Sequence, residues 1–310
     1  MTIPAARHNV NFMRPLIFAA LCIASVAPPA TGQRVPGRDL LGYSLGAAAE
    51  APALATETGD GVWNPATIAL PSDTRARLSA AALAGPPTQE LGAQLLSAAV
   101  AFPRGVTLGL SVIRASVGGL IRTETDPQSI GPEIPYNTTL VSAQVAQRSG
   151  ANVLAGVAVR YRMGQLERTR GSALSIDAGL LARGLTRRDV RVGLSTFLFE
   201  LTDQASQATI NAAADMRALG ADTLSEGRLG YSFTFIEQSS SEHYVVGTAR
   251  VGKFSTRLGL ARTVAFGQGE WRPRLAVGLH YARYLVAVAR EDNGGGLDPT
   301  YQFTLSAAIK

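Results

Sequence analysis

The sequence contains few of the residues from which disulfides, metal sites and nucleic-acid surfaces are built. Its one cysteine is Cys22, and His243 and His280 lie far apart with no second ligand at a suitable spacing. We therefore expect no disulfide, no bound metal and no cofactor. Lysine is limited to Lys253 and Lys310, so arginine carries most of the net charge of +6. The arginines are spread singly along the chain, without the basic stripe of a nucleic-acid surface.

Long apolar runs are absent after the N-terminus. Arg7 and Arg14 precede an apolar stretch over residues 15–27, and the small residues Ala30-Thr31-Gly32 follow it. A basic flank, a short apolar run and small residues at the cleavage site are typical of a secretory signal peptide. The run is shorter than the about 20 residues that a membrane-spanning helix needs. We predict that residues 1–32 are a cleaved export signal.

The rest of the chain consists largely of segments in which apolar side chains alternate with small or polar ones. In the last segment Tyr301, Phe303 and Leu305 alternate with Gln302 and Thr304. Because successive side chains of a strand point to opposite faces, each segment predicts a strand with one apolar and one polar face. We expect about fourteen strands, at residues 75–84, 91–102, 105–116, 137–148, 151–162, 172–183, 188–199, 207–218, 227–237, 242–251, 254–263, 270–279, 283–290 and 300–309.

The polar faces of these strands favour a membrane barrel over a soluble sandwich. They repeatedly carry arginine, which a sandwich core cannot bury without a partner, whereas the interior of a membrane barrel is polar. Glycine recurs on the same faces and leaves room inside. The inward positions are Arg160, Arg162, Arg191, Arg228, Arg257, Arg274 and Arg283, with Gly156, Gly179, Gly193, Gly230, Gly259 and Gly278. In the strand at 188–199, Val192, Leu194 and Leu198 are expected on the opposite, lipid-facing side.

The connections between the predicted strands also fit a barrel. Some are very short, such as Pro103-Arg104 and Ser149-Gly150, and others are longer, at residues 117–136, 163–171 and 291–299. Short periplasmic turns at one end and longer loops at the other are typical of outer-membrane barrels. The fold class is therefore all-β, a transmembrane antiparallel barrel of about fourteen strands at residues 75–310.

Residues 33–74 show no such alternation and are rich in alanine and glycine. They contain Trp63-Asn64-Pro65-Ala66, in which Asn64-Pro65 predicts a turn. This segment resembles the N-terminal hatch of the FadL superfamily of outer-membrane proteins. Within that superfamily the chain looks most like the PorV/PorQ branch. The stretches Pro103–Val112 and Gly156–Tyr161 resemble strands of the same group.

The resemblance implies a fourteen-stranded barrel whose N-terminal segment, residues 33–74, folds into the lumen as a plug. Trp63, Asn64, Pro65 and Ala66 form the plug motif. Classical members of the superfamily pass hydrophobic compounds such as long-chain fatty acids, whereas PorV-like members are partners in protein secretion. Both kinds share the hatch, so the hatch does not choose between them.

The inward arginines allow two interpretations. They bias the lumen towards anionic or amphiphilic solutes, or they pair with acids on the plug and the wall and hold the plug in place. We favour the second, because a plug has to be fixed. The lumen candidates are Arg160, Arg191, Arg228, Arg257, Arg274 and Asp177, with Glu50, Glu57 and Asp60 as further acidic partners.

Motifs for covalent chemistry are weak. Residues 247–254 nearly match a phosphate-binding loop, but Phe254 stands where Ser or Thr is required, and no Gly-x-Ser-x-Gly occurs. We interpret Glu291–Asp298 as an outer loop and not as a calcium site. We expect no enzyme. The predicted function is passive transport of hydrophobic or amphiphilic small molecules across the outer membrane of a Gram-negative bacterium, with outer-membrane lipid around the barrel. The alternative is a non-enzymatic PorV-like partner of secretion-machinery proteins.

Overall fold

The structure is a computed structural model that describes residues 35–310 except 59, 87–89, 124–129, 202–207, 223–224, 238–239, 266–267 and 294–297. The signal peptide predicted at residues 1–32 lies outside the described residues, as do residues 294–297 of the loop Glu291–Asp298. Within the described part of the chain, no helix is long and apolar enough to cross a membrane.

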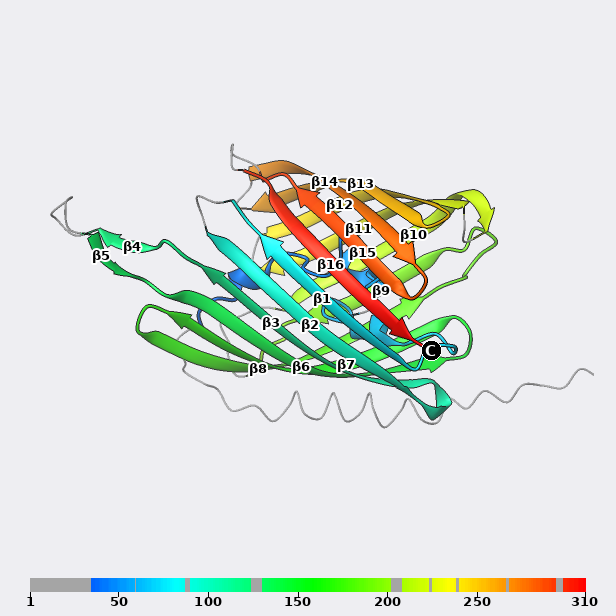
Figure 1. The fold of residues 1–310 in the computed structure, drawn as a ribbon, viewed down its shortest axis with the longest axis horizontal. Coiled ribbons are helices and arrows are strands. Elements are labelled where there is room, and N and C mark those ends of the chain that lie inside the picture. The colour runs from blue at the N-terminus through cyan, green and yellow to red at the C-terminus, as the bar shows by residue number, and fades with distance from the viewer. Residues whose placement is uncertain are drawn as a thin grey trace, which may run out of the picture.

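Fourteen antiparallel strands of the described chain close into a barrel (Figure 1). The barrel closes where β1 (Ala76–Ala84) pairs with β16 (Thr300–Ile309), with Ala76 opposite Ile309. The predicted all-β class and strand number are confirmed. The other strands of the wall are β2 (Leu91–Phe102), β3 (Val106–Val117), β6 (Tyr136–Ser149), β7 (Val153–Leu166), β8 (Thr169–Ala182), β9 (Arg191–Phe197), β10 (Thr209–Asp222), β11 (Ser225–Glu237), β12 (Ser240–Val251), β13 (Phe254–Ala265), β14 (Gln268–Tyr281) and β15 (Tyr284–Glu291).

The two faces of the wall follow the alternation of the sequence. Large apolar side chains such as Leu96, Leu258 and Phe303 point outward and are exposed, whereas Ser111 and Thr304 point inward and are buried. A closed barrel pairs every strand, so no backbone edge faces lipid. The outward apolar surface is therefore the membrane-facing side, as the alternation predicts.

Aromatic side chains border this outward surface near both ends of the strands. Trp271 and Tyr301 lie at one end, Tyr281 and Tyr284 at the other, and all four are exposed. Amphipathic rings at these heights match the aromatic girdles of outer-membrane barrels.

The two ends of the barrel differ in their connections. At one end β2 and β3 are joined by the 3-10 turn η5 (Pro103–Gly105), and β12 and β13 by a two-residue turn at Gly252. At the other end, the link from β3 to β6 carries a separate hairpin of β4 (Ile121–Thr123) and β5 (Ile130–Glu133). By this asymmetry the short turns mark the periplasmic end.

The long loop expected at residues 163–171 is wrong. Strands β7 and β8 stay paired as far as Leu166 opposite Thr169, which leaves only Glu167 and Arg168 as the turn. Glu167 has a φ of 54°, the left-handed conformation of a tight hairpin turn. In the sequence the apolar outward positions end at Met163 and polar Gln165 follows, because the strand continues beyond the lipid-facing band, where apolar side chains are not required.

Two predicted side-chain directions are also wrong. Arg283 does not face the lumen, because it lies in the turn between β14 and β15 and is exposed. Leu198 does not face lipid, because β9 ends at Phe197 and Leu198 turns inward with a φ of 57°. The carboxylate of Asp177 accepts hydrogen bonds from the amides of Leu198 and Phe199, at 3.1 and 3.0 Å, in place of strand partners. The wall thus bulges into the lumen at this point.

Residues 35–74, which we call the N-terminal segment, lie against the inner face of the wall (blue in Figure 1). The segment has no strand and folds into short 3-10 helices: η2 (Asp39–Leu41), η3 (Pro52–Leu54) and η4 (Pro65–Ile68). Helix η3 contacts β9 and β10, and η4 contacts β6, β7 and β8. Most of its residues are buried, so the segment supplies much of the core of the protein.

The membrane-facing register predicts the effect of an outward charge. Leu258 is 66% exposed near the middle of β13 and Leu219 is 74% exposed near the periplasmic end of β10. In lipid vesicles, Leu258→Arg should lower the free energy of unfolding by about 2–4 kcal/mol, and Leu219→Arg by about 0–1 kcal/mol. The measurement is a urea titration of the folded barrel. Equal costs for the two variants would place Leu258 outside the hydrocarbon layer.

Candidate functional site

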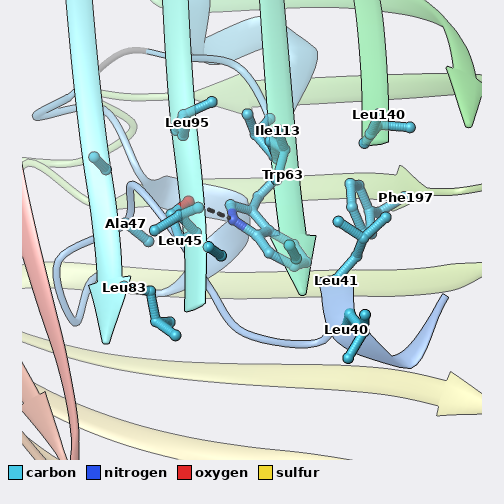
Figure 2. Close-up of a cluster of buried hydrophobic side chains, with 14 of the residues drawn as sticks. Leu40, Leu41, Leu45, Ala47, Trp63, Leu83, Leu95, Ile113, Leu140 and Phe197 are labelled. Carbon is cyan, nitrogen blue, oxygen red and sulfur yellow. Dashed lines mark hydrogen bonds between the residues drawn. The ribbon is translucent and has the colours of Figure 1, made fainter. Parts of the chain in front are cut away.

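The predicted motif Trp63-Asn64-Pro65-Ala66 is buried against the inner face of the wall. Trp63 lies among apolar side chains of the N-terminal segment and of strands β1, β2, β3, β6 and β9 (Figure 2). Its indole Nε1 donates to the carbonyl of Leu45 at 3.1 Å, and its ring lies 4.4 Å from the ring of Phe197. The cluster that surrounds it contains Leu40, Leu41, Leu45, Ala47, Leu83, Leu95, Ile113, Leu140 and Phe197.

Asn64 joins the motif to the wall. Its Nδ2 donates to the carbonyl of Ala53 at 2.7 Å and to the carbonyl of Leu180 in β8 at 3.1 Å. Its Oδ1 accepts from the amide of Ala66 at 3.0 Å and caps η4, with Pro65 as the first helical residue. One side chain therefore satisfies a carbonyl and an amide of the irregular segment and joins the segment to β8.

Two glycines of the wall make room for this motif. A Cβ on Gly179 would lie 2.0 Å from Oδ1 of Asn64, and one on Gly156 would lie 2.4 Å from the backbone of Pro65. Gly193 is in similar contact with the carbonyl of Ala53. The inward glycines thus allow the backbone of the segment to approach the strands.

The lumen arginines bind the main chain of the segment. Four of them, from β6, β7 and β13, donate hydrogen bonds to carbonyl oxygens that have no strand partner. The bonds run from Arg148 to Leu70 (2.7 Å), from Arg160 to Val62 (2.6 Å), from Arg162 to Val35 and Pro36 (3.1 and 2.8 Å) and from Arg257 to Ala48 (3.1 Å). Arg148 was not predicted, because it lies at the end of its strand next to the turn.

Six lumen arginines that the sequence predicted also have acidic partners. Arg160 lies 2.6 Å from Asp177 with both side chains fully buried, and Arg162 lies 2.7 Å from Glu200. Arg191 and Arg228 share Asp215, Arg228 also pairs with Asp189, Arg257 pairs with Glu57, and Arg274 pairs with Glu242 and Glu291. Buried guanidinium groups require such partners.

Sequence reasoning named the arginines but missed most of these acids. Asp215 and Glu242 lie on inward positions of β10 and β12, so the alternation contains a signal for them. Glu200 follows the bulge of β9, where the alternation is interrupted. Asp60, expected to pair with an arginine, instead accepts from the hydroxyl of Thr58 and the amide of Val62, both at 3.0 Å.

Glu50 and Glu57 bring two carboxylates of the segment together beside Arg257. Burial raises the pKa of Glu50 to about 7. Burial also raises the pKa of Glu57, but hydrogen bonds from His280 and the charge of Arg257 outweigh it and lower that pKa to about 2. Glu57 therefore holds the charge that balances Arg257.

This cluster includes a serine and a histidine but not the geometry of a hydrolase. Nε2 of His280 lies 2.7 Å from Glu57 and 3.4 Å from the hydroxyl of Ser255. In a catalytic triad the acid and the serine bind opposite nitrogens of the imidazole. Here one nitrogen faces both groups, so His280 does not relay a proton between them. No three His, Cys, Asp or Glu side chains of the described chain are grouped to hold a metal ion.

A cavity of about 740 Å³ opens above the segment at the long-loop end of the barrel. Its outer rim includes Tyr136, Leu166 and Ile236, which lie where strands β6, β7 and β11 reach the long-loop end of the barrel. Its apolar lining includes Leu41, Pro52, Trp63, Phe197 and Leu198, and its polar lining includes Arg38, Asp39, Thr209, Asn211, Thr234 and Glu242. The volume falls within the range of about 300–1,000 Å³ that is usual for small-molecule sites.

No family model and no curated protein sequence matches the chain. Solved structures match it in fold. The Pseudomonas putida toluene transporter TodX aligns over 90% of this chain and 99% of its own, with 8% identity and a TM-score of 0.55. The CymD monoaromatic hydrocarbon channel aligns over 85% and 96%, with 11% identity and a TM-score of 0.55. A Pseudomonas aeruginosa FadL homologue aligns over 86% and 98%, with 13% identity and a TM-score of 0.49.

At these identities the likeness concerns the fold alone. It agrees with the predicted closed barrel of fourteen strands, and membership of the FadL superfamily stays a prediction. Membership of the PorV/PorQ branch stays a prediction.

The close approach at Gly179 predicts a steric effect on the motif. Gly179→Ala should lower the free energy of unfolding by about 1–3 kcal/mol, because its Cβ would overlap Asn64. Gly247→Ala is the matched control, since its Cβ would lie 3.8 Å from the nearest atom. The measurement is the temperature at which the barrel loses its folded mobility in SDS gels. A tolerated Gly179→Ala would show that Asn64 does not depend on this approach.

The two glutamates predict opposite responses to pH. The pKa of Glu50 is about 7 in the folded protein and 4.5 for the free group. The folded barrel therefore loses stability through Glu50 as the pH rises from about 4.5 to 7. Glu50→Gln should therefore stabilise the barrel at pH 8 and change little at pH 4. Glu57, with a folded pKa of about 2, contributes stability above about pH 4.5 that is lost towards pH 2. Glu57→Gln should therefore destabilise the barrel at pH 8.

Both changes should be on the order of 1–3 kcal/mol. Heat denaturation at pH 4 and pH 8 measures them, with the exposed Glu270→Gln as the control. The same sign for Glu50→Gln and Glu57→Gln at pH 8 would contradict the assignment of the charge to Glu57.

Proposed function

We propose that the chain is a bacterial outer-membrane channel that passes hydrophobic or amphiphilic small molecules passively. The observation that carries the proposal is the cavity of about 740 Å³ at the long-loop end, with an apolar floor of Leu41, Trp63, Phe197 and Leu198. An apolar cavity open to the outside of a barrel suits compounds that partition poorly into water. The likeness in fold to hydrocarbon channels agrees with this use.

The N-terminal segment acts in this proposal as the plug that closes the lumen beneath the cavity. Its helix η4 is fixed to β8 through Asn64 and to β7 through the bond from Arg160 to Val62. A segment held by side chains, without strand pairing to the wall, moves without breaking the barrel. A solute that enters from outside passes to the periplasm when part of this segment shifts.

The ion pairs favour solutes without net charge. Arg274 is matched by Glu242 and Glu291, and Arg162 by Glu200. An anion that enters the lumen therefore finds arginines already neutralised. Within the described residues, no observation favours the alternative role as a secretion partner.

Filling the cavity should block transport. Thr209 lines the cavity on the inner face of β10, and its neighbour Ile210 faces outward with 43% of its surface exposed. Thr209→Trp should reduce uptake of radiolabelled toluene and oleate several-fold, whereas Ile210→Trp should leave it unchanged. The measurement uses cells that lack their own hydrophobic channels, with surface levels of each variant matched. Unchanged uptake in Thr209→Trp cells, or no uptake above cells without the protein, contradicts the proposal.

A further inference from the structure

One polar group of the cavity has no partner. Asn211 lies on the inner face of β10 and is 1% exposed, and it is among the residues that line the cavity. Its Oδ1 accepts a hydrogen bond from the hydroxyl of Thr234 at 3.0 Å. Its Nδ2 has no hydrogen-bond partner among the residues that the structure describes. Buried amide donors are nearly always bonded, so an unused donor at a cavity wall points to a ligand.

The neighbours of Asn211 do not compete for this donor. In the sheet Asn211 is paired with Ser195 on β9 and with Thr234 on β11. The hydroxyl of Ser195 donates to the carbonyl of Trp63 at 2.7 Å, and the hydroxyl of Thr234 is used by Oδ1. Thr234 on β11 therefore holds the amide in place, and neither hydroxyl accepts a hydrogen bond from its nitrogen.

The charged groups of the cavity are occupied. Glu242 pairs with Arg272 and Arg274 at 2.7 and 2.8 Å. Asp39 accepts from the hydroxyl of Tyr136, and Arg38 lies 3.5 Å from Glu200. A charged ligand would have to displace one of these partners, whereas a neutral acceptor fits the free amide donor at no such cost.

We propose that the cavity binds neutral oxygenated apolar compounds, whose ketone, ester or ether oxygen accepts a hydrogen bond from Nδ2 of Asn211. The apolar body of the ligand then packs against Trp63, Phe197 and Leu198, which line the same cavity. Specificity of this kind follows from one positioned polar group in an apolar site. The inference deepens the proposed transport function, since it names the class of solute, but binding is tested without transport.

The test compares acetophenone with ethylbenzene, which differ in the acceptor oxygen. Equilibrium dialysis of tritiated ligand against the purified full barrel in detergent gives each affinity. We expect the ketone to bind about tenfold more tightly than the hydrocarbon, the effect of one hydrogen bond. Asn211→Leu should remove this preference, weakening the ketone about tenfold and leaving ethylbenzene unchanged or tighter. Ser232→Ala, a buried change on β11 that does not line the cavity, should change neither affinity.

A second measurement places the ligand. The chain has two tryptophans. In a Trp271→Phe background Trp63 is therefore the single reporter, and 4-bromoacetophenone should quench its fluorescence at the dialysis affinity.

Several results would overturn the inference. Equal wild-type affinities for ketone and hydrocarbon would mean that solvent satisfies the amide. An equal loss of both in Asn211→Leu would mean a structural role, and a preference for 1-phenylethanol with no ketone binding would mean that the amide offers its oxygen. Tight ketone binding without uptake would contradict the transport proposal alone. Uptake without a preference for the ketone would contradict the proposed ligand class alone.

Discussion

Hydrogen bonds from wall arginines to the main chain of the N-terminal segment are the interaction on which the rest of the lumen depends. A chain that runs through a barrel without joining the sheet has carbonyl groups that no strand can satisfy. Arg148, Arg160 and Arg257 reach from the wall to the carbonyls of Leu70, Val62 and Ala48. Guanidinium suits this task because it presents several donors in one plane. An unsatisfied buried carbonyl costs about 1–3 kcal/mol, so each bond removes a large penalty.

The other features of the lumen follow from the use of arginine as the hydrogen-bond donor. Arginines buried beside a segment need negative charge, and the wall supplies it through acids such as Asp177, Glu242 and Glu291. The side chains that make these bonds need the segment close to the strands, and Gly156 and Gly179 permit that approach. The lumen becomes a dense, nearly neutral core that leaves a cavity of about 740 Å³ next to the segment near the outer end. Its neutrality is the reason that an uncharged solute suits it.

The strand pattern was predictable because lipid imposes it: every second side chain of a spanning strand has to be apolar. The predictions failed where lipid no longer acts, as in the hairpin beyond Arg162 and the turn at Arg283. Partner acids were harder to predict, because a pair depends on the register between strands that the alternation of one strand does not contain. Arg274 of β14 lies directly opposite Glu291 of β15. Arg191 of β9 lies directly opposite Asp215 of β10. Neither pair is evident until the register of the two strands is known. The bulge of β9 was hidden for the same reason, since Asp177 lies on a different strand.

Asp177 connects the shape of the cavity to the position of the segment. One carboxylate accepts from the amides of Leu198 and Phe199 and thereby holds the bulge that turns Phe197 and Leu198 into the lumen. The same carboxylate pairs with Arg160, whose guanidinium lies 4.9 Å from the centre of the Phe197 ring and donates to the carbonyl of Val62. Val62 precedes Trp63, whose indole rests on Phe197. A continuous set of contacts therefore runs from the wall through Asp177 and Arg160 to the motif, and from Trp63 back to the wall at Phe197. Because these contacts join the apolar floor of the cavity to the N-terminal segment, a movement of the segment changes the shape of the cavity floor.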